Sequence, residues 1–229
     1  MTKNLLPTRL KRVKFIAVLL LLIALPRSLG AQAEKPQIPD DPLKTLKNGN
    51  AHFFDDEHFK EERKRAYQGD QHPYAVILSC SDSRVPPELV FGEWESLGKL
   101  FVIRAAGNVV DPVALGSIEY GVEHLHAKLI FVLGHERCGA VRAAIEQAAK
   151  KPALLPPNIS WFVDPIKLAV ERTKGKPEIE TVKENVRVQI QNLRTQSSII
   201  RELEEKEGLR IAGGFYNFSA PKSGKVDFF

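Results

Sequence analysis

The fold is decided by one stretch of the chain, the apolar run LIFVL at residues 129–133, which the polar cluster GHERCG at residues 134–139 follows directly. Five consecutive apolar residues, rich in β-branched and aromatic side chains, are typical of a strand buried on both faces of a parallel sheet. The chain has three more runs of this kind, the last of them interrupted by two glycines: Tyr74–Leu78, Leu100–Ile103 and Ile211–Phe218.

Segments with helical spacing of apolar residues alternate with these runs. They are Leu43–Gln68, Val113–His126, Ala140–Lys151, Ile166–Lys174 and Ile179–Glu205. Asn48-Gly49-Asn50 predicts a break in the first helix, and Pro112 suits the first turn of the second. The alternation predicts an α/β domain with a mainly parallel central β-sheet flanked by helices.

The N-terminus has the three parts of a secretory signal peptide. A basic start precedes the apolar run Phe15–Leu25, and the small-residue sequence Ala31-Gln32-Ala33 follows it. Eleven apolar residues rise only ~16 Å as a helix, against a hydrocarbon core of ~30 Å. We therefore expect residues 1–33 to be removed and residues 34–229 to form one domain, exported to the periplasm or secreted, with no stable membrane span after cleavage. An uncleaved N-terminal anchor is the alternative.

Composition and charge exclude several classes of protein. The 229 residues are 43% apolar and 27% charged, which suits one globular core, and two cysteines are too few for a disulfide-built scaffold. The net charge of +5 comes from the leader: six of the 33 basic residues lie in residues 1–33, leaving 27 against 28 acidic residues. Residues 34–229 are nearly neutral and have no excess positive charge to attract a polyanion, so we expect no nucleic-acid partner.

Two polar clusters directly follow two of the predicted strands, SCSDSR at residues 79–84 and GHERCG at residues 134–139. Proteins with a parallel sheet bind their ligands at the carboxyl ends of the strands. Two clusters at two such ends come together if their strands are neighbours. Cys80, His135 and Cys138 then supply two thiolates and one imidazole, a donor set that suits Zn²⁺ and leaves a fourth position open. A Cys80–Cys138 disulfide, or two inert buried thiols, are the alternatives for an exported protein.

Asp82 and Arg84 add a carboxylate and a guanidinium to the first cluster. A carboxylate beside the metal could orient a bound hydroxide, or could itself bind the metal and close the site. An arginine two residues later could hold the carboxylate back through a bidentate pair. A loop salt bridge without a catalytic role is the alternative.

Four motifs together resemble the β-class carbonic anhydrases over nearly the whole chain after Asp41: CSDSRVP at residues 80–86, RAAGN at 104–108, SIEY at 117–120 and GHERCGA at 134–140. The resemblance implies a lyase with one zinc ion per chain, which Cys80, His135 and Cys138 bind. Asp82 and Arg84 match the family's Asp–Arg dyad, and Asp82 also matches the fourth zinc ligand of closed forms. The resemblance further implies a homodimer or a dimer of dimers, with an N-terminal helical arm that packs on a partner subunit.

Further residues match positions around the family's substrate cleft. Gln71 matches a glutamine that steadies the substrate, and Phe101 and Tyr120 match residues that line an apolar cleft across a dimer interface. His124 matches a position proposed for proton transfer, although a surface histidine is the plainer interpretation. Ile77 stands where members with a secondary, inhibitory bicarbonate site place a tryptophan. The sequence is therefore more similar to the plant-type subgroup, from which Arg137 departs.

The expected function is reversible hydration of CO2 to bicarbonate and a proton by zinc-bound hydroxide, with CO2 and bicarbonate as the small-molecule substrates. Three alternatives remain open. They are a carbonyl sulfide or carbon disulfide hydrolase on the same scaffold, a non-catalytic zinc-binding protein and a redox dithiol protein. The 58 positions between the two cysteines disfavour the last.

Overall fold

The structure is a computed structural model that describes residues 41–92, 97–149, 155–219 and 221–229. Residues 46–229 form one compact unit, which contains the whole sheet. The predicted leader lies outside the described residues. Within those that are described, no helix combines the length and the apolar character needed to span a bilayer.

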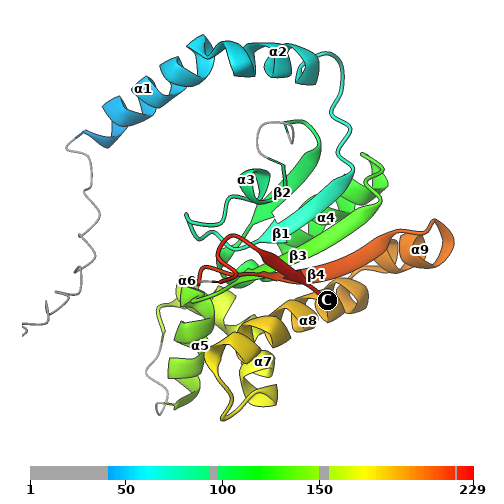
Figure 1. Cartoon of the computed structure of the whole chain (residues 1–229). Helices are drawn as coiled ribbons and strands as arrows, with labels where there is room; N and C mark the ends of the chain where they lie inside the picture. Colours follow the sequence, from blue (N-terminus) through cyan, green and yellow to red (C-terminus); the bar gives the residue numbers. More distant parts are fainter. Residues whose placement is uncertain (1–40, 93–96, 150–154, 220) are drawn as a thin grey trace, which may run out of the picture. The chain divides into compact units, whose positions relative to one another are not determined.

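The core of this unit is a five-stranded sheet (Figure 1). Its strands are β1 (Ala75–Ser79), β2 (Leu100–Arg104), β3 (Leu129–His135), β4 (Arg210–Tyr216) and β5 (Val226–Phe228). The spatial order is β2-β1-β3-β4-β5, and the first four strands are parallel while β5 runs antiparallel to β4. The mainly parallel sheet expected from the sequence is confirmed, and all four predicted strands form.

The helices of the described residues are α1 (Pro42–Asp55), α2 (Glu57–Ala66), α3 (Pro87–Phe91), α4 (Pro112–Glu123), α5 (Gly139–Ala149), α6 (Pro157–Val163), α7 (Lys167–Arg172), α8 (Glu178–Gln196) and α9 (Ser198–Lys206). The helices from α3 to α9 connect and cover the strands, whereas α1 and α2 precede the first strand in the sequence (Figure 1). Pro112 does open α4, where the Asp111 side chain accepts a hydrogen bond from the Ala114 backbone N–H. This is the usual N-cap arrangement.

Alternate side chains of the two central strands enter different clusters. Val76, Leu78, Ile130 and Val132 pack with α4, α8 and α9, whereas their neighbours in the sequence pack with α3 and the C-terminal segment. Burial on both faces explains why these strands are continuous apolar runs rather than alternating ones. A third cluster contains Cys80 and Cys138 together with apolar residues of α5 to α8.

Two glycines let α8 lie close against the sheet. A Cβ atom at Gly134 of β3 would stand 2.7 Å from a methyl carbon of Val186, and one at Gly213 of β4 would stand 2.5 Å from another. Real Cβ atoms do not come that close, so both positions require glycine. Gly134 directly precedes His135, so the close packing of α8 fixes the backbone that carries a candidate ligand.

Several details differ from expectation, and the short helices α3 and α6 were not predicted. The helix of residues 42–55 continues through Asn48-Gly49-Asn50 and ends only at Asp55, so the predicted break was wrong. The long C-terminal helix divides at Ser197, whose hydroxyl caps α9 by accepting a hydrogen bond from the Ile200 backbone N–H. The short β5 was missed, because three residues after a turn give too little pattern to recognise.

Candidate metal centre

The strand order brings the two polar clusters together. β1 and β3 are neighbours, with Ser79 opposite Leu133, so Cys80 leaves the sheet beside the end of β3. His135 is the last residue of β3, and Cys138 directly precedes α5. The tight connection between them places Arg137 at a φ of 56°, an uncommon conformation for a residue other than glycine. This turn directs His135 and Cys138 toward Cys80.

The donor atoms of Cys80, His135 and Cys138 all lie within 4.8 Å of one another, and all three side chains are buried. The sulfur atoms are 4.0 Å apart, and both cysteines are free, so the structure shows no disulfide between them. Two sulfurs, each ~2.3 Å from a tetrahedral zinc ion, would lie about 3.8 Å apart. The observed sulfur separation therefore suits a zinc ion.

The ring of His135 is oriented for metal binding. Its Nδ1 lies 2.9 Å from the Glu136 carbonyl oxygen, which can only accept, so Nδ1 carries the proton. Nε2 is then unprotonated, and its lone pair is available to a metal ion. It is buried and has no hydrogen-bond partner among the described residues. A buried nitrogen without a hydrogen-bond partner destabilises the folded protein. A metal ion bound to Nε2 would supply the missing interaction.

Without a metal, the contact between the two sulfurs favours a thiolate at Cys80 and a neutral thiol at Cys138. The hydrogen bond from Cys138 to Cys80 lowers the pKa of the Cys80 thiol, and the same contact raises the pKa of Cys138. Burial disfavours a charged His135, but the negative charges of Cys80 and Asp82 and the Glu136 carbonyl outweigh burial and raise its pKa. A divalent cation would replace these shared protons and leave both sulfurs as thiolates.

Cys80 is also held by a polar chain that reaches into α8. The Gly107 backbone N–H donates to the Cys80 sulfur over 3.3 Å, while the Gly107 carbonyl accepts from the Asn185 side chain over 2.8 Å. Asn185 accepts in turn from Gln189 over 3.0 Å. Both α8 side chains are fully buried, so the chain is rigid. A hydrogen bond from an N–H group to a thiolate stabilises the negative charge of the sulfur.

Asp82 and Arg84 form the bidentate pair expected of them. The Arg84 Nε and Nη2 atoms donate to the two carboxylate oxygens over 2.9 and 2.7 Å, and the Arg84 backbone N–H donates to one of them over 3.0 Å. This hydrogen bonding holds the pKa of Asp82 at about 2. The Asp82 carboxylate lies 4.0 Å from Nε2 of His135, so it adjoins the group of ligands.

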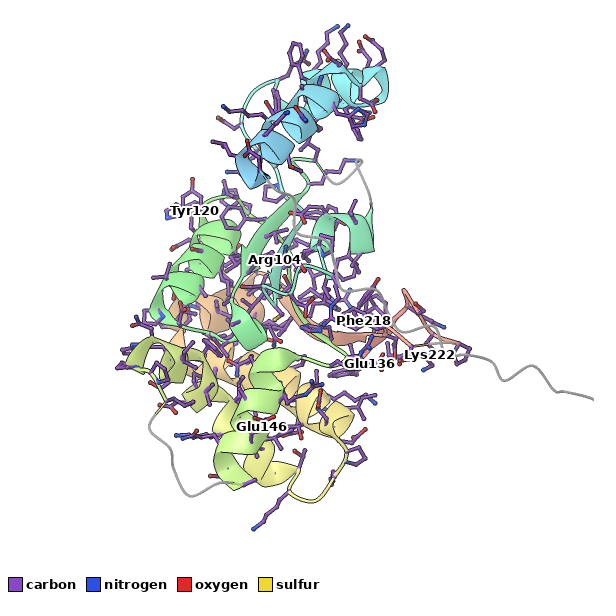
Figure 2. All side chains as sticks on the ribbon, turned by 90° about the vertical axis from the view of Figure 1, so that its left-hand side faces the viewer. Arg104, Tyr120, Glu136, Glu146, Phe218 and Lys222 are labelled. Atoms are coloured by element: carbon purple, nitrogen blue, oxygen red, sulfur yellow. The ribbon has the colours of Figure 1, made fainter. Side chains whose placement is uncertain are left out.

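Arg104 fixes the backbone between Cys80 and Asp82. Its guanidinium donates to the carbonyl oxygens of both residues, and it extends from the end of β2 (Figure 2). The RAAGN sequence served above only to mark a resemblance, and the role of Arg104 was not predicted. One indication of this role was present in the sequence, because Arg104 is the last residue of the strand that neighbours β1.

The remaining predicted site residues lie elsewhere in the single chain. Gln71 lines a separate hollow of about 230 Å³ with His72 and Lys99. Tyr120 is 47% exposed on α4, at a ring-centroid distance of 6.1 Å from Phe101, and Figure 2 shows it well apart from Glu136.

Phe101 packs against the core with α4. His124 is exposed, and its ring lies 5.3 Å from that of Tyr120. Within the described part of the chain, neither these residues nor Gln71 form a hydrogen bond, ion pair or ring contact with the three candidate ligands.

Two more residues near the ligands were missed by sequence reasoning. The Glu136 carboxylate accepts hydrogen bonds from the backbone N–H groups of Phe218 and Ser219, 82 and 83 positions away. The Phe218 ring lies 5.6 Å from the His135 ring. Nothing in the sequence pairs these positions. By contrast, Asn185 and Gln189 could have been found as two amides four residues apart within the apolar face of a helix.

Comparisons with known proteins agree on one family. A family model described as carbonic anhydrase matches residues 75–226. A carbonic anhydrase of Pseudomonas aeruginosa is 35% identical over 169 residues, which cover 69% of this chain and 73% of the relative. A carbonic anhydrase of Mycolicibacterium smegmatis is 45% identical over 106 residues, which cover 44% of this chain and 50% of that protein. For that relative and a similar one, the match spans only about half of their length.

The fold agrees as well. A crystal structure of a tetrameric β-carbonic anhydrase from Sordaria macrospora aligns with a TM-score of 0.65 at 23% identity, covering 81% of this chain and 95% of that one. At this identity the likeness concerns the fold. The family model covers every candidate ligand, and the sheet order brings those ligands together at one edge. The chain therefore belongs to the β-carbonic anhydrase family.

Proposed function

We propose that the protein catalyses the reversible hydration of CO2 to bicarbonate and a proton, with one zinc ion per chain held by Cys80, His135 and Cys138. The observation that carries the proposal is the buried donor group, with an unpartnered His135 Nε2, beside the Asp82–Arg84 pair. Two sulfurs and one imidazole suit zinc and leave a fourth position for a reactant. Family membership supports the same reaction.

The zinc ion would act as a Lewis acid that lowers the pKa of water at the open position. The role of Asp82 follows from its charge. With a pKa of about 2 it is a carboxylate at neutral pH, so it can accept a hydrogen bond but cannot donate one. It would therefore accept a hydrogen bond from the attacking O–H group. This hydrogen bond would orient the group so that a lone pair of its oxygen faces the carbon of CO2.

Arg84 would keep Asp82 available for that task. Its bidentate pair engages both carboxylate oxygens, and a carboxylate engaged on both oxygens is less free to turn and become a fourth metal ligand. We infer that the conformation described here corresponds to the open form of the site. Gly107 and Asn185 would maintain the charge and position of Cys80 during turnover.

We further propose that a second copy of the chain completes the substrate cleft, in a homodimer or a dimer of dimers. Gln71, Phe101 and Tyr120 make no recorded contact with the ligands in the described part of one chain, so a role for them beside CO2 requires a partner. Large apolar side chains are exposed on α4, where Val113 is 79% and Tyr120 47% accessible. Such surfaces favour association. Proton transfer by His124 and packing of the N-terminal arm on that partner remain proposals as well.

Export is the last part of the proposal. The basic start, the apolar run Phe15–Leu25 and Ala31-Gln32-Ala33 support a signal peptide and a periplasmic or secreted enzyme. Expression of the full chain in a two-membrane bacterium, followed by fractionation and mass measurement, tests it. We expect a periplasmic species that begins near Glu34. A full-length species retained with the membrane would show an uncleaved anchor instead.

The decisive experiment measures zinc content and CO2 hydration on the same sample, from about pH 6.5 to about pH 9. We expect about one zinc per chain and activity that rises with pH. A Cys138→Ser variant is the control, because it should lose both zinc and activity. A full complement of zinc without CO2 hydration at any pH would overturn the proposal, and hydrolysis of carbonyl sulfide by that sample would redirect it.

A further inference from the structure

Phe218 lies where three charged or metal-binding side chains meet. It follows β4, and its ring centroid lies 4.5 Å from the guanidinium carbon of Arg84 and 5.3 Å from that of Arg137. The same ring is 5.6 Å from the ring of His135. A guanidinium within about 6 Å of an aromatic face is attracted by the ring quadrupole. The phenyl ring therefore contacts the arginine of the Asp82–Arg84 pair on a side that Asp82 does not occupy.

Glu136 holds Phe218 in that place. Its carboxylate accepts from the Phe218 backbone N–H over 2.8 Å, from the Ser219 backbone N–H over 2.9 Å and from the Ser219 hydroxyl over 2.6 Å. Three hydrogen bonds to one carboxylate fix the chain that follows β4 against the residue next to His135. The ring of Tyr216 meets the Phe218 ring edge-on, at a centroid distance of 5.5 Å.

Arg84 needs a support of this kind. Its side chain is 50% exposed, and an exposed ion pair by itself restrains two side chains only weakly. If Arg84 leaves, the Asp82 carboxylate loses its bidentate partner and is free to turn toward the nearby His135 Nε2, 4.0 Å away. An aromatic surface that limits the guanidinium to one orientation therefore protects the geometry of the pair.

We propose that Phe218 is a positioning residue for the Asp82–Arg84 pair, and that Glu136 acts through Phe218 by fixing its backbone. The ring keeps the Arg84 guanidinium in the plane from which it reaches both oxygens of Asp82. The consequence for turnover rests on the proposed function, whereas the placement of Arg84 does not. The two statements can therefore be tested apart.

The test follows the Arg84 Nε–H signal by NMR in the zinc-loaded and the zinc-free full-length chain, assigned by its loss in an Arg84→Lys variant. In Phe218→Leu, which keeps apolar bulk but removes the ring, we expect exchange of this proton with water to rise roughly two- to fivefold. Phe218→Tyr retains the ring face and should restore slow exchange. Glu136→Ala should resemble Phe218→Leu, because it releases the backbone that carries the ring.

Phe229→Leu is the matched control. Phe229 also lies beneath an arginine, with the guanidinium carbon of Arg187 4.8 Å from its ring centroid, but Arg187 is not part of the site. It should leave both the Arg84 signal and CO2 hydration unchanged, while Phe218→Leu should lower kcat. Unchanged Arg84 exchange in Phe218→Leu, or an equal change in Phe229→Leu, overturns the inference. Absence of CO2 hydration in the wild type overturns the proposed function alone, since the exchange measurement still decides the role of Phe218.

Discussion

Asp82 lies between two groups that compete for its carboxylate. Arg84 engages both oxygens, and the unpartnered Nε2 of His135, a candidate metal ligand, lies 4.0 Å from one of them. The guanidinium lowers the pKa of Asp82 to about 2, so the carboxylate is charged and attractive to a cation as well. If a metal is bound as proposed, the balance between these two partners would decide whether its fourth position stays open.

Replacement of Asp82 by asparagine separates its catalytic role from metal binding. Asn keeps the size of the side chain but presents an amide whose nitrogen donates rather than accepts. We expect Asp82→Asn to retain about one zinc per chain and to lose turnover by about a hundredfold. Stopped-flow CO2 hydration and zinc analysis on one sample measure both. Unchanged hydration would show that Asp82 does not orient the reactant.

Gly107 gives a second prediction at the scale of one residue. Its φ of 69° disfavours any side chain, and a Cβ atom there would stand 2.7 Å from the Ile166 side chain and 3.0 Å from Ala140. We expect Gly107→Ala to lower the free energy of unfolding by about 1–3 kcal/mol. Zinc affinity should fall by roughly ten- to a hundredfold, because the N–H donated to Cys80 is displaced.

Urea denaturation and competition with a chelator measure the two effects of Gly107→Ala. Gly116→Ala is the control, since no atom lies within 4 Å of a Cβ at that helical position. Glycine within a helix is less stable than alanine, so this control should be neutral or stabilising. Equal destabilisation in both variants would contradict the role given to Gly107.

Elements that carry their own pattern were predictable, and those defined by distant contacts were not. The four predicted strands form as apolar runs, and burial is most complete in β1 and β3. Cys80, His135 and Cys138 meet because these two strands are neighbours. The three residues of β5 lack such a pattern and form only because β4 offers an edge. The hydrogen bonds from Phe218 and Ser219 to Glu136 likewise join positions that no local rule connects.

The division of the C-terminal helix at Ser197 is stabilised by one polar contact with α4 and by an ion pair between its two parts. The Ser197 hydroxyl donates to Glu119 of α4 over 2.6 Å, and Arg194 of α8 forms a bidentate pair with Glu204 of α9 at 2.6 and 2.9 Å. The Arg194 side chain holds the pKa of Glu204 below its ordinary value of 4.5. The pair therefore fixes the angle at which α9 returns toward α4.

A Glu204→Gln variant tests that contribution and its pH dependence. Both side chains are partly exposed, so we expect a loss of only about 0.5–1 kcal/mol in the free energy of unfolding. Because the pKa of Glu204 is lowered in the folded state, its stabilisation is complete above about pH 4.5 and disappears as the pH falls through the folded-state pKa. The difference between variant and wild type should accordingly shrink in acid.

Urea unfolding at neutral pH and at about pH 3 measures this difference. Glu205→Gln, on the same helix, is the control, because Glu205 forms no ion pair with α8 in the described part of the chain. A difference for Glu204→Gln that stays constant down to acid pH would rule out the charge as its cause.

For the whole molecule, one chain places the candidate metal ligands and the Asp82–Arg84 pair together but leaves the predicted substrate residues at a distance. Tyr120 contacts Phe101 and His124 rather than any ligand. A closed twofold dimer would bring the α4 surface of each copy to the other, so each site could receive side chains from the partner. The sequence could suggest such a contribution from a partner only through a resemblance to a family. Neither the periodicity nor the spacing of residues in one chain indicates which side chains a second copy contributes.

Mixed dimers decide whether Tyr120 acts across the interface. A Cys80→Ser chain lacks a ligand but keeps Tyr120, and a Tyr120→Ala chain keeps the ligands. Each variant alone should be nearly inactive. Co-expression with two different tags and purification through both isolates the mixed dimer, in which one site receives its zinc ligands from one chain and its tyrosine from the other. We expect about half of the wild-type CO2 hydration, because one of two symmetric sites is then complete. If Tyr120 served the ligands of its own chain, neither site would be complete and the mixed dimer would stay inactive.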